Sequence, residues 1–210
     1  MIPQNLNLKT NRISLSVSND LRFGRKTNNL ERNLSRPKNA EVSLSAFSFL
    51  FSEVLQYSQN RVHGIQDLEK LLNEFGYRVG IRTLELLMWR EKNVRRETRV
   101  LGILYFINTV VWKTLFGKQA DSLEKSTENE DEYMISDNEP LVNKFISVPK
   151  ELSQLNCGAF IAGIVEAILD GCQFPSRVTA HSVPLDGQPL RTTILIKFDK
   201  NVLLREDQMK

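Results

Sequence analysis

The chain has 210 residues, of which 41% are hydrophobic and 25% are charged, and its formal net charge is +3. These proportions are typical of a folded globular protein and argue against a wholly disordered chain. The first thirty residues lack the apolar core of a secretory signal, and no apolar run reaches the roughly 18–20 residues that span a membrane. The sequence therefore predicts a soluble cytoplasmic protein.

The charges are unevenly distributed along the chain. Residues 1–40 contain eight Lys or Arg against Asp20 and Glu31, which gives +6. Because this segment is rich in Asn and Ser and has no sustained hydrophobic period, we expect a flexible basic arm. Residues 121–139 contain eight acidic residues against Lys125, which gives −7. They predict a mobile acidic loop that ends where strand-like sequence begins.

A nucleic-acid partner is not expected. Binding of nucleic acid calls for basic residues interleaved with exposed aromatic residues, and the arm offers one weak match, residues 22–26. Blocks of like charge are usually solvated tails and loops. A nucleic-acid reader therefore ranks third among the candidate functions. Steep salt dependence that disappears without residues 1–40 would reveal it.

Residues 41–200 are expected to form a single domain that begins with a helix at Ser43. Its apolar side chains follow the spacing of one helical face, and Phe49 lies off that face. Three phenylalanines within five residues, on more than one side, indicate a helix that contacts both a core and a partner. The residues on the face are Leu44, Phe47, Leu50, Phe51, Val54 and Leu55.

A second helix is predicted from Gly64 to Phe75, with a single apolar face. Gly76 would provide a left-handed cap at its end. Residues 76–82 are then interpreted as a tight turn. The apolar face consists of Ile65, Leu68, Leu71, Leu72 and Phe75.

Two further helices follow, over residues 81–92 and 98–116. The arginine-rich stretch 90–99 between them is interpreted as a solvated helix junction held by ion pairs, in preference to a phosphate site. The helix over 98–116 is apolar along most of its length, so most of it must be buried.

The second half of the chain predicts strands around one apolar helix. Residues 133–135 and 143–148 are expected to form a hairpin, and residues 177–183 and 191–198 a second one. Residues 201–210 are assigned to a C-terminal tail. Together the elements predict an α+β fold with a small antiparallel sheet.

The helix predicted over residues 155–171 organises the domain. Large apolar side chains occupy one half of its circumference, where we expect the sheet, and small residues occupy the other half. The small side lets another backbone approach closely or stays partly wet around Glu166 and Asp170. Burying the large side chains at roughly 1.5–3 kcal/mol each outweighs the roughly 1 kcal/mol lost at Gly163.

Catalytic signatures are missing from the sequence. The two histidines, His63 and His181, have no adjacent carboxylate or thiol, and no metal-ligand spacing occurs. Cys157 and Cys172, placed on one helix, would lie roughly 22 Å apart and could not form a disulfide. We therefore expect no enzyme, no cofactor and no metal site.

Several motifs occur together in one order. The stretch from Phe75 to Arg82 resembles the Gly-Tyr-x-x-Gly-x-Arg turn of the Bet-three-like subunits of TRAPP, the transport protein particle that tethers vesicles in early secretory traffic. Residues 95–102, 146–151 and 156–167 are similar to the fifth-subunit branch of this family. The resemblance covers roughly residues 41–198. Its motif residues here are Gly76, Tyr77, Gly80 and Arg82.

The resemblance implies a Bet-three-like α/β plait and a heterodimer with a paralogous subunit. It further implies other TRAPP partners, among them a longin-like subunit, and contact with a Rab-type GTPase and with ER and cis-Golgi membranes through the complex. The chain would be a non-enzymatic core scaffold that supports nucleotide exchange in ER-to-Golgi traffic. The implied partner interface consists of Leu44, Phe47, Phe49, Phe51, Leu55, Leu68 and Leu72.

One departure from the family concerns lipid. A related subunit carries an acylated cysteine between its third and fourth helices, whose chain fills a tunnel, but residues 92–96 here contain no thiol. We predict no acylation there, and Trp89, Phe106 or Trp112 would fill any tunnel. A lipid-binding or small-molecule-binding domain remains the alternative function, because the helix over 98–116 is so apolar.

Overall fold

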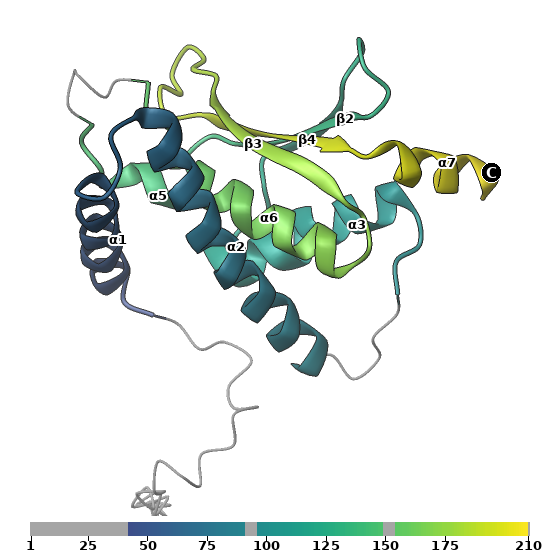
Figure 1. Cartoon of the computed structure of the whole chain (residues 1–210), viewed down its shortest axis with the longest axis horizontal. Helices are drawn as coiled ribbons and strands as arrows, with labels where there is room; N and C mark the ends of the chain where they lie inside the picture. Colours follow the sequence, from purple (N-terminus) through teal and green to yellow (C-terminus); the bar gives the residue numbers. More distant parts are fainter. Residues whose placement is uncertain (1–41, 91–95, 149–153, 210) are drawn as a thin grey trace, which may run out of the picture. The chain divides into compact units, whose positions relative to one another are not determined.

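The computed structural model describes residues 42–90, 96–148 and 154–209. The helices of the first half are α1 (Leu44–Gln59), α2 (Ile65–Arg90), α3 (Val100–Phe106), the π-helical segment η2 (Ile107–Val111) and α4 (Trp112–Phe116). The second half contains β1 (Ser122–Lys125), β2 (Glu132–Asp137), α5 (Leu141–Lys144), α6 (Ala159–Gly171), β3 (Ser176–Ser182), β4 (Thr192–Phe198) and α7 (Lys200–Gln208). Figure 1 shows their arrangement.

The strands form one antiparallel sheet in the order β1-β2-β4-β3. In β4, Ile194, Ile196 and Phe198 are buried, whereas Lys197 is exposed. This alternation is that of a strand with one covered face. Helices α6 and α2 lie on the same side of the sheet (Figure 1). The predicted α+β fold and the β3–β4 hairpin are therefore confirmed.

Helix α6 lies between the sheet and α2, and nine of its residues are buried. A Cβ added to Gly76 of α2 would overlap the carbonyl oxygen of Phe160, and one added to Gly163 of α6 would overlap that of Asn73. We call Gly76, Gly80 and Gly163 the glycine seam. The small side of α6 therefore admits another backbone, as its sequence predicted.

The turn predicted over residues 76–82 is wrong, because α2 runs through it as one helix of 26 residues. Neither Gly76 nor Gly80 has the positive φ of a left-handed cap. At Gly80 an added Cβ would stand 2.6 Å from the carbonyl oxygen of Ile164. These glycines serve close helix packing, which compensates for the roughly 1 kcal/mol that each costs inside a helix.

The acidic segment is more ordered than predicted. Ser122–Lys125 was expected to belong to a mobile loop, but it pairs with β2. Leu123 is half-buried against the core, while Glu124 and Lys125 are exposed. One apolar side chain on the inner face is enough to place this short edge strand, and the surrounding charges concealed it.

The strand predicted over residues 143–148 is also wrong. Leu141–Lys144 forms a short helix after Pro140, and residues 145–148 have no regular structure. Both edges of β2 are already paired, with β1 and β4. The side chain of Val142 is instead buried, and the Asn143 amide donates to the Thr192 hydroxyl at 3.0 Å.

Three other boundaries differ from the sequence predictions. The helix expected over 98–116 is present, but its centre widens into η2, and it ends at Gly117 with a φ of 76°. The helix expected from residue 155 begins at Ala159, because the Asn156 side chain accepts a hydrogen bond from the Gly158 amide at 2.7 Å. The C-terminal segment, expected to be a tail, forms α7.

Candidate partner interface

Helix α1 exposes large apolar side chains. Phe49 is 78% exposed, Leu50 is 66% exposed and Leu44 is 45% exposed, and only Phe51 and Ser58 of this helix are buried. Large apolar side chains exposed in number on one element often belong to a site of protein interaction. Most side chains of this helix are thus exposed, whereas one side of it faces the core.

Aromatic stacking holds the inner side of α1 in place. The ring of Phe51 stacks on that of Phe47, with centroids 5.8 Å apart, and meets the edge of Phe160 from α6 at 5.4 Å. Farther along, Tyr57 of α1 contacts Phe75 of α2 with ring centroids 6.5 Å apart. These contacts fix which face of α1 points outward.

The structure divides the interface residues named from the family resemblance into two groups. Phe51, Leu68 and Leu72 are buried in the chain's own core, where no partner reaches them. Leu44 and Phe49 are exposed, and Phe47 and Leu55 are partly buried against the core. Leu50 was assigned to the inner stripe from its spacing, but it points outward.

Helix α2 adds apolar side chains on the side turned away from α6. Val79 is 40% exposed, Leu86 38% and Trp89 59%. Val79 and Leu86 were not predicted as interface residues from the sequence, because the predicted turn interrupted this helix. Taken as one helix, residues 79 and 86 lie seven positions apart and so share a face. We refer to Leu44, Phe49, Leu50, Val79, Leu86 and Trp89 as the α1–α2 surface.

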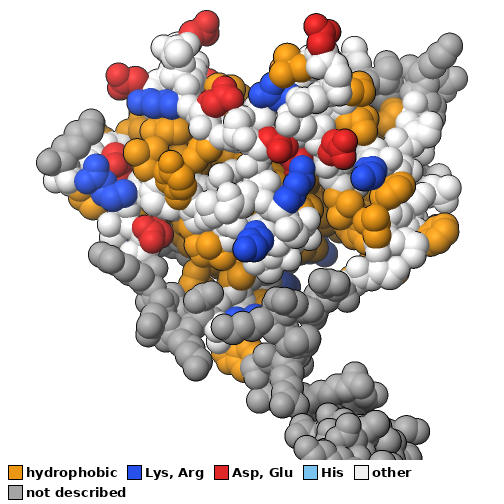
Figure 2. Space-filling view, turned by 180° about the vertical axis from the view of Figure 1, so that it is seen from behind, with side chains coloured by type: hydrophobic (Ala, Val, Ile, Leu, Met, Phe, Trp, Pro, Cys, Tyr) orange, Lys and Arg blue, Asp and Glu red, His pale blue; other side chains and the backbone are white. Residues whose placement is uncertain are grey.

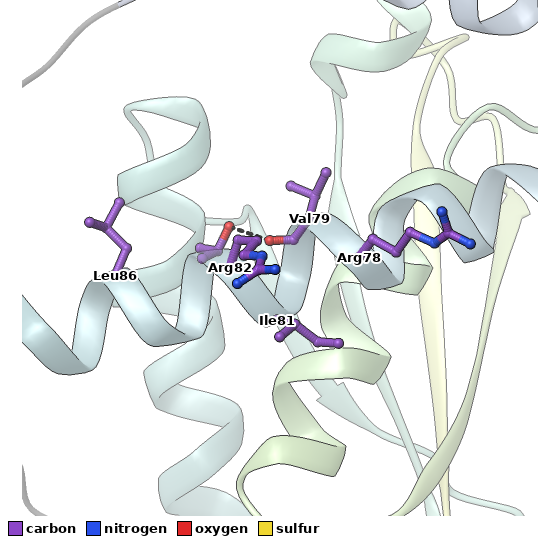
Figure 3. Close-up of a pocket in the computed structure, with 6 residues that line it drawn as sticks. Arg78, Val79, Ile81, Arg82 and Leu86 are labelled. Carbon is purple, nitrogen blue, oxygen red and sulfur yellow. Dashed lines mark hydrogen bonds between the residues drawn. The ribbon is translucent and has the colours of Figure 1, made fainter.

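A shallow hollow of about 540 Å³ lies on α2 itself. Figure 3 shows Val79 and Leu86 on one side of the helix, with Ile81 on the opposite side. The Thr83 hydroxyl donates to the backbone carbonyl oxygen of Val79 at 2.9 Å, so the Thr83 side chain lies against its own helix. The lining residues are Arg78, Val79, Ile81, Arg82, Thr83 and Leu86.

Behind the α1–α2 surface, polar contacts join α2 to α6. The Asn73 amide donates to Glu166 at 3.1 Å, and the Tyr77 hydroxyl donates to Asp170 at 3.0 Å. The hydrogen bond to Asp170 raises the pKa of Tyr77, and burial raises the pKa of Glu166. Tyr77 of the family motif is thus an interhelical contact, whereas Arg82 is exposed and pairs with Glu85 at 3.1 Å.

No catalytic constellation is found in the part of the chain that the structure describes. His63 and His181 are exposed, and the His181 ring bonds only the Thr179 hydroxyl, at 2.8 Å. The described residues contain no group of three side chains able to hold a metal ion. Burial raises the pKa of Cys157 to about 11, so this thiol is not a nucleophile at neutral pH.

The described helices also include none that is long and apolar enough to cross a membrane. On the side seen from behind, hydrophobic patches are interrupted by Lys, Arg, Asp and Glu side chains (Figure 2). The exposed apolar side chains of α1 and α2 are therefore the candidate partner interface in the part of the chain that the structure describes.

A family model described as "Transport protein particle (TRAPP) component" matches residues 47–199. The chain belongs to this family. It is 59% identical to trafficking protein particle complex subunit 5 of Dictyostelium discoideum, over 85% of this chain and 96% of that protein. The human protein of the same name is 50% identical, over 84% and 90%. These relatives confirm the TRAPP resemblance and its fifth-subunit branch.

Two other TRAPP proteins are similar to this chain, one in sequence and one in structure. Subunit 31 of Saccharomyces cerevisiae is 32% identical, over 80% of each chain. The structure is similar to that of a trafficking protein particle complex subunit 3 from Naegleria fowleri covalently bound to palmitic acid. The TM-score is 0.65, with 18% identity over 75% of this chain and 95% of that chain. The Bet-three-like plait predicted from the sequence is thereby confirmed.

The side chains expected to fill a TRAPP tunnel lie in different environments. Trp112 is 1% exposed, and its indole N–H donates to Asp137 at 3.0 Å. Phe106 is half-buried. Trp89 was assigned wrongly, because it projects from the outer side of α2 and is 59% exposed. The thiol-free junction 92–96 falls almost wholly outside the described residues.

Proposed function

We propose that this chain is a non-enzymatic core scaffold subunit of the TRAPP vesicle-tethering complex. Membership of the family supports the complex, and one observation supports the scaffold role. Phe49 and Leu50, adjacent on α1, are 78% and 66% exposed. Burial of such side chains contributes roughly 1.5–3 kcal/mol each, a gain that this chain leaves to a partner.

The partner proposed for the α1–α2 surface is a paralogous Bet-three-like subunit. Other TRAPP subunits, including a longin-like one, would complete the particle, which would act on a Rab-type GTPase as an exchange factor in ER-to-Golgi traffic. The chain would reside in the cytoplasm, peripheral to ER and cis-Golgi membranes through the complex. It would contribute architecture to the exchange reaction and would hold no cofactor.

Co-expression of the full-length chain with a paralogous subunit tests the proposal. Size-exclusion chromatography with light scattering should show a one-to-one heterodimer. Phe49→Asp should abolish it, because a carboxylate would have to be buried without a partner charge. Tyr105→Ser, which changes a 61% exposed aromatic residue on α3, is the matched control and should leave the dimer intact.

Two results would count against this function. One is a heterodimer that withstands Phe49→Asp while circular dichroism shows both variants folded. The other is a lone monomer that retains a bound lipid in native mass spectrometry, which would favour the lipid-binding alternative.

A further inference from the structure

An apolar cavity of about 300 Å³ lies where α2, α3 and the end of α6 meet. Hydrophobic side chains from α2 and α3 form much of its lining, and two charged residues, Arg96 and Glu97, stand on the connection before α3. The opposite wall is the connection from α6 to β3, where Cys172 and Gln173 lie. The lining residues are Leu84, Met88, Arg96, Glu97, Ile103, Phe106, Gly171, Cys172 and Gln173.

Helix α7 holds the first of these walls through Glu206. One carboxylate oxygen accepts from Arg99 Nε at 2.7 Å, and the other accepts from the Val100 amide at 3.0 Å. Arg99, at the N-cap of α3, makes no side-chain cap of its own. Glu206 therefore supplies the cap of α3 from another helix. Arg99 also donates to the Met209 carbonyl oxygen at 3.0 Å.

The neighbouring residue of α7, Arg205, holds the second wall. Its guanidinium donates to the Gln173 carbonyl oxygen at 2.9 Å and lies 4.4 Å from the centre of the Phe174 ring. Gln173 has a φ of 67°, which is unfavourable for a residue with a side chain. The hydrogen bond from Arg205 is therefore made to Gln173, the residue of the cavity wall whose backbone is strained.

We propose that α7 is a strap that controls access to this cavity by joining its two walls. Within α7, only Val202 is fully buried. The strap is otherwise held by contacts such as the Arg99–Glu206 pair, whose side chains are 46% and 18% exposed. Elements with few buried apolar contacts open at low free energy. When α7 is released, the α3 wall and the α6–β3 wall of the cavity separate, whereas the packing of α6 on the sheet does not change.

The chain carries its own reporter for this movement, because Cys172 lies in the cavity wall and Cys157, the only other cysteine, is 1% exposed in the core. The full-length chain is treated with N-ethylmaleimide, and the modification rate of each cysteine is followed by peptide mass spectrometry. Glu206→Gln and Arg205→Ala should each raise the Cys172 rate about tenfold, because a charge-assisted hydrogen bond closes the strap in each case. The Cys157 rate should not change.

Leu204→Ala is the matched control, since Leu204 is on the same helix and is 61% exposed. A measurement on the unsubstituted chain gives a second test. Raising the sodium chloride concentration from about 0.1 M to about 1 M screens the exposed pair and should increase the Cys172 rate. The proposal is overturned if the Cys172 rate stays within twofold in both variants and in salt. Equal acceleration at Cys157 would also overturn it, because that result indicates general unfolding.

Discussion

Helices α1 and α6 are both apolar, but the fraction of their residues that is buried differs greatly. Nine of the 13 residues of α6 are buried, compared with two of the 16 residues of α1. α6 has the sheet on one side and α2 on the other, so this chain supplies all of its packing. Helix α1 packs against the rest of this chain on its inner side only.

We expect this difference to separate folding stability from the proposed assembly within one domain. Substitutions in α6 should act on folding, since its contacts are internal. Substitutions on the outer face of α1 should act on binding, since the folded chain makes no use of that face.

Gly163→Val in α6 should have the largest effect. A side chain at this position would collide with the backbone of α2 at Asn73 and Tyr77, and two helices cannot separate without losing their other contacts. We expect a loss of about 3 kcal/mol or more in the free energy of unfolding, measured by urea denaturation. Gly64→Ala is the control, because the nearest atom to its added Cβ is 3.7 Å away. If both variants had the same free energy of unfolding, the close backbone packing at the glycine seam would be contradicted.

Two neighbouring phenylalanines of α1 should separate the two roles within a single helix. Phe51→Ala removes a ring that is 4% exposed and should lower the free energy of unfolding by about 3–5 kcal/mol. Phe49→Ala should change it by less than about 0.5 kcal/mol. It should instead weaken the heterodimer by about 2 kcal/mol, roughly 30-fold in Kd, as at an interface hot spot. Calorimetry of folding and of binding checks both values. A reversed pattern would mean that Phe49 belongs to the core.

The smallest effect concerns the pH dependence of stability at Glu166. Burial raises the pKa of this carboxyl above its usual value of 4.5, so the folded state prefers the protonated form. The contribution of protonated Glu166 to the free energy of unfolding is fully present below pH 4.5. It is lost as the pH rises through the pKa that Glu166 has in the folded state. Glu166→Gln keeps an acceptor for Asn73 and should gain a few tenths of a kcal/mol at pH 7.

The gain from Glu166→Gln should vanish near pH 4. Thermal unfolding at both pH values measures it, with the exposed Glu74→Gln as control. A gain that is the same at pH 4 and pH 7 would show that burial of the charge is not its cause.

Periodicity identified the elements whose two faces differ. The apolar stripe of α1 and the alternation Ile194, Ile196, Phe198 in β4 depend on neighbours only a few residues away, so the sequence is sufficient to place them. The outward direction of Leu50 was not predicted, because its spacing fits the inner stripe as well as the outer edge. Only the position of α6 decides between the two.

Two of the wrong predictions, the turn over residues 76–82 and the C-terminal tail, have a common physical origin in contacts between distant segments. A glycine such as Gly76 commonly marks the end of a helix. Here it lies inside α2, because the backbone of Phe160, more than eighty residues away, packs against it. α7 is polar, and it is ordered by Arg99 and by the backbone of Gln173. One local signal was available for the seam, since Gly76 and Gly80 are spaced four apart, as on one helical face.

An unbroken α2 also has a mechanical consequence. At 1.5 Å per residue, its 26 residues make a rod of about 39 Å. Phe75, which contacts Tyr57 of α1, and Met88, which lines the cavity between α2, α3 and α6, both belong to this one helix. The proposed partner surface and the cavity of the proposed strap therefore share one rigid element, whose spacing is set by its own helix geometry.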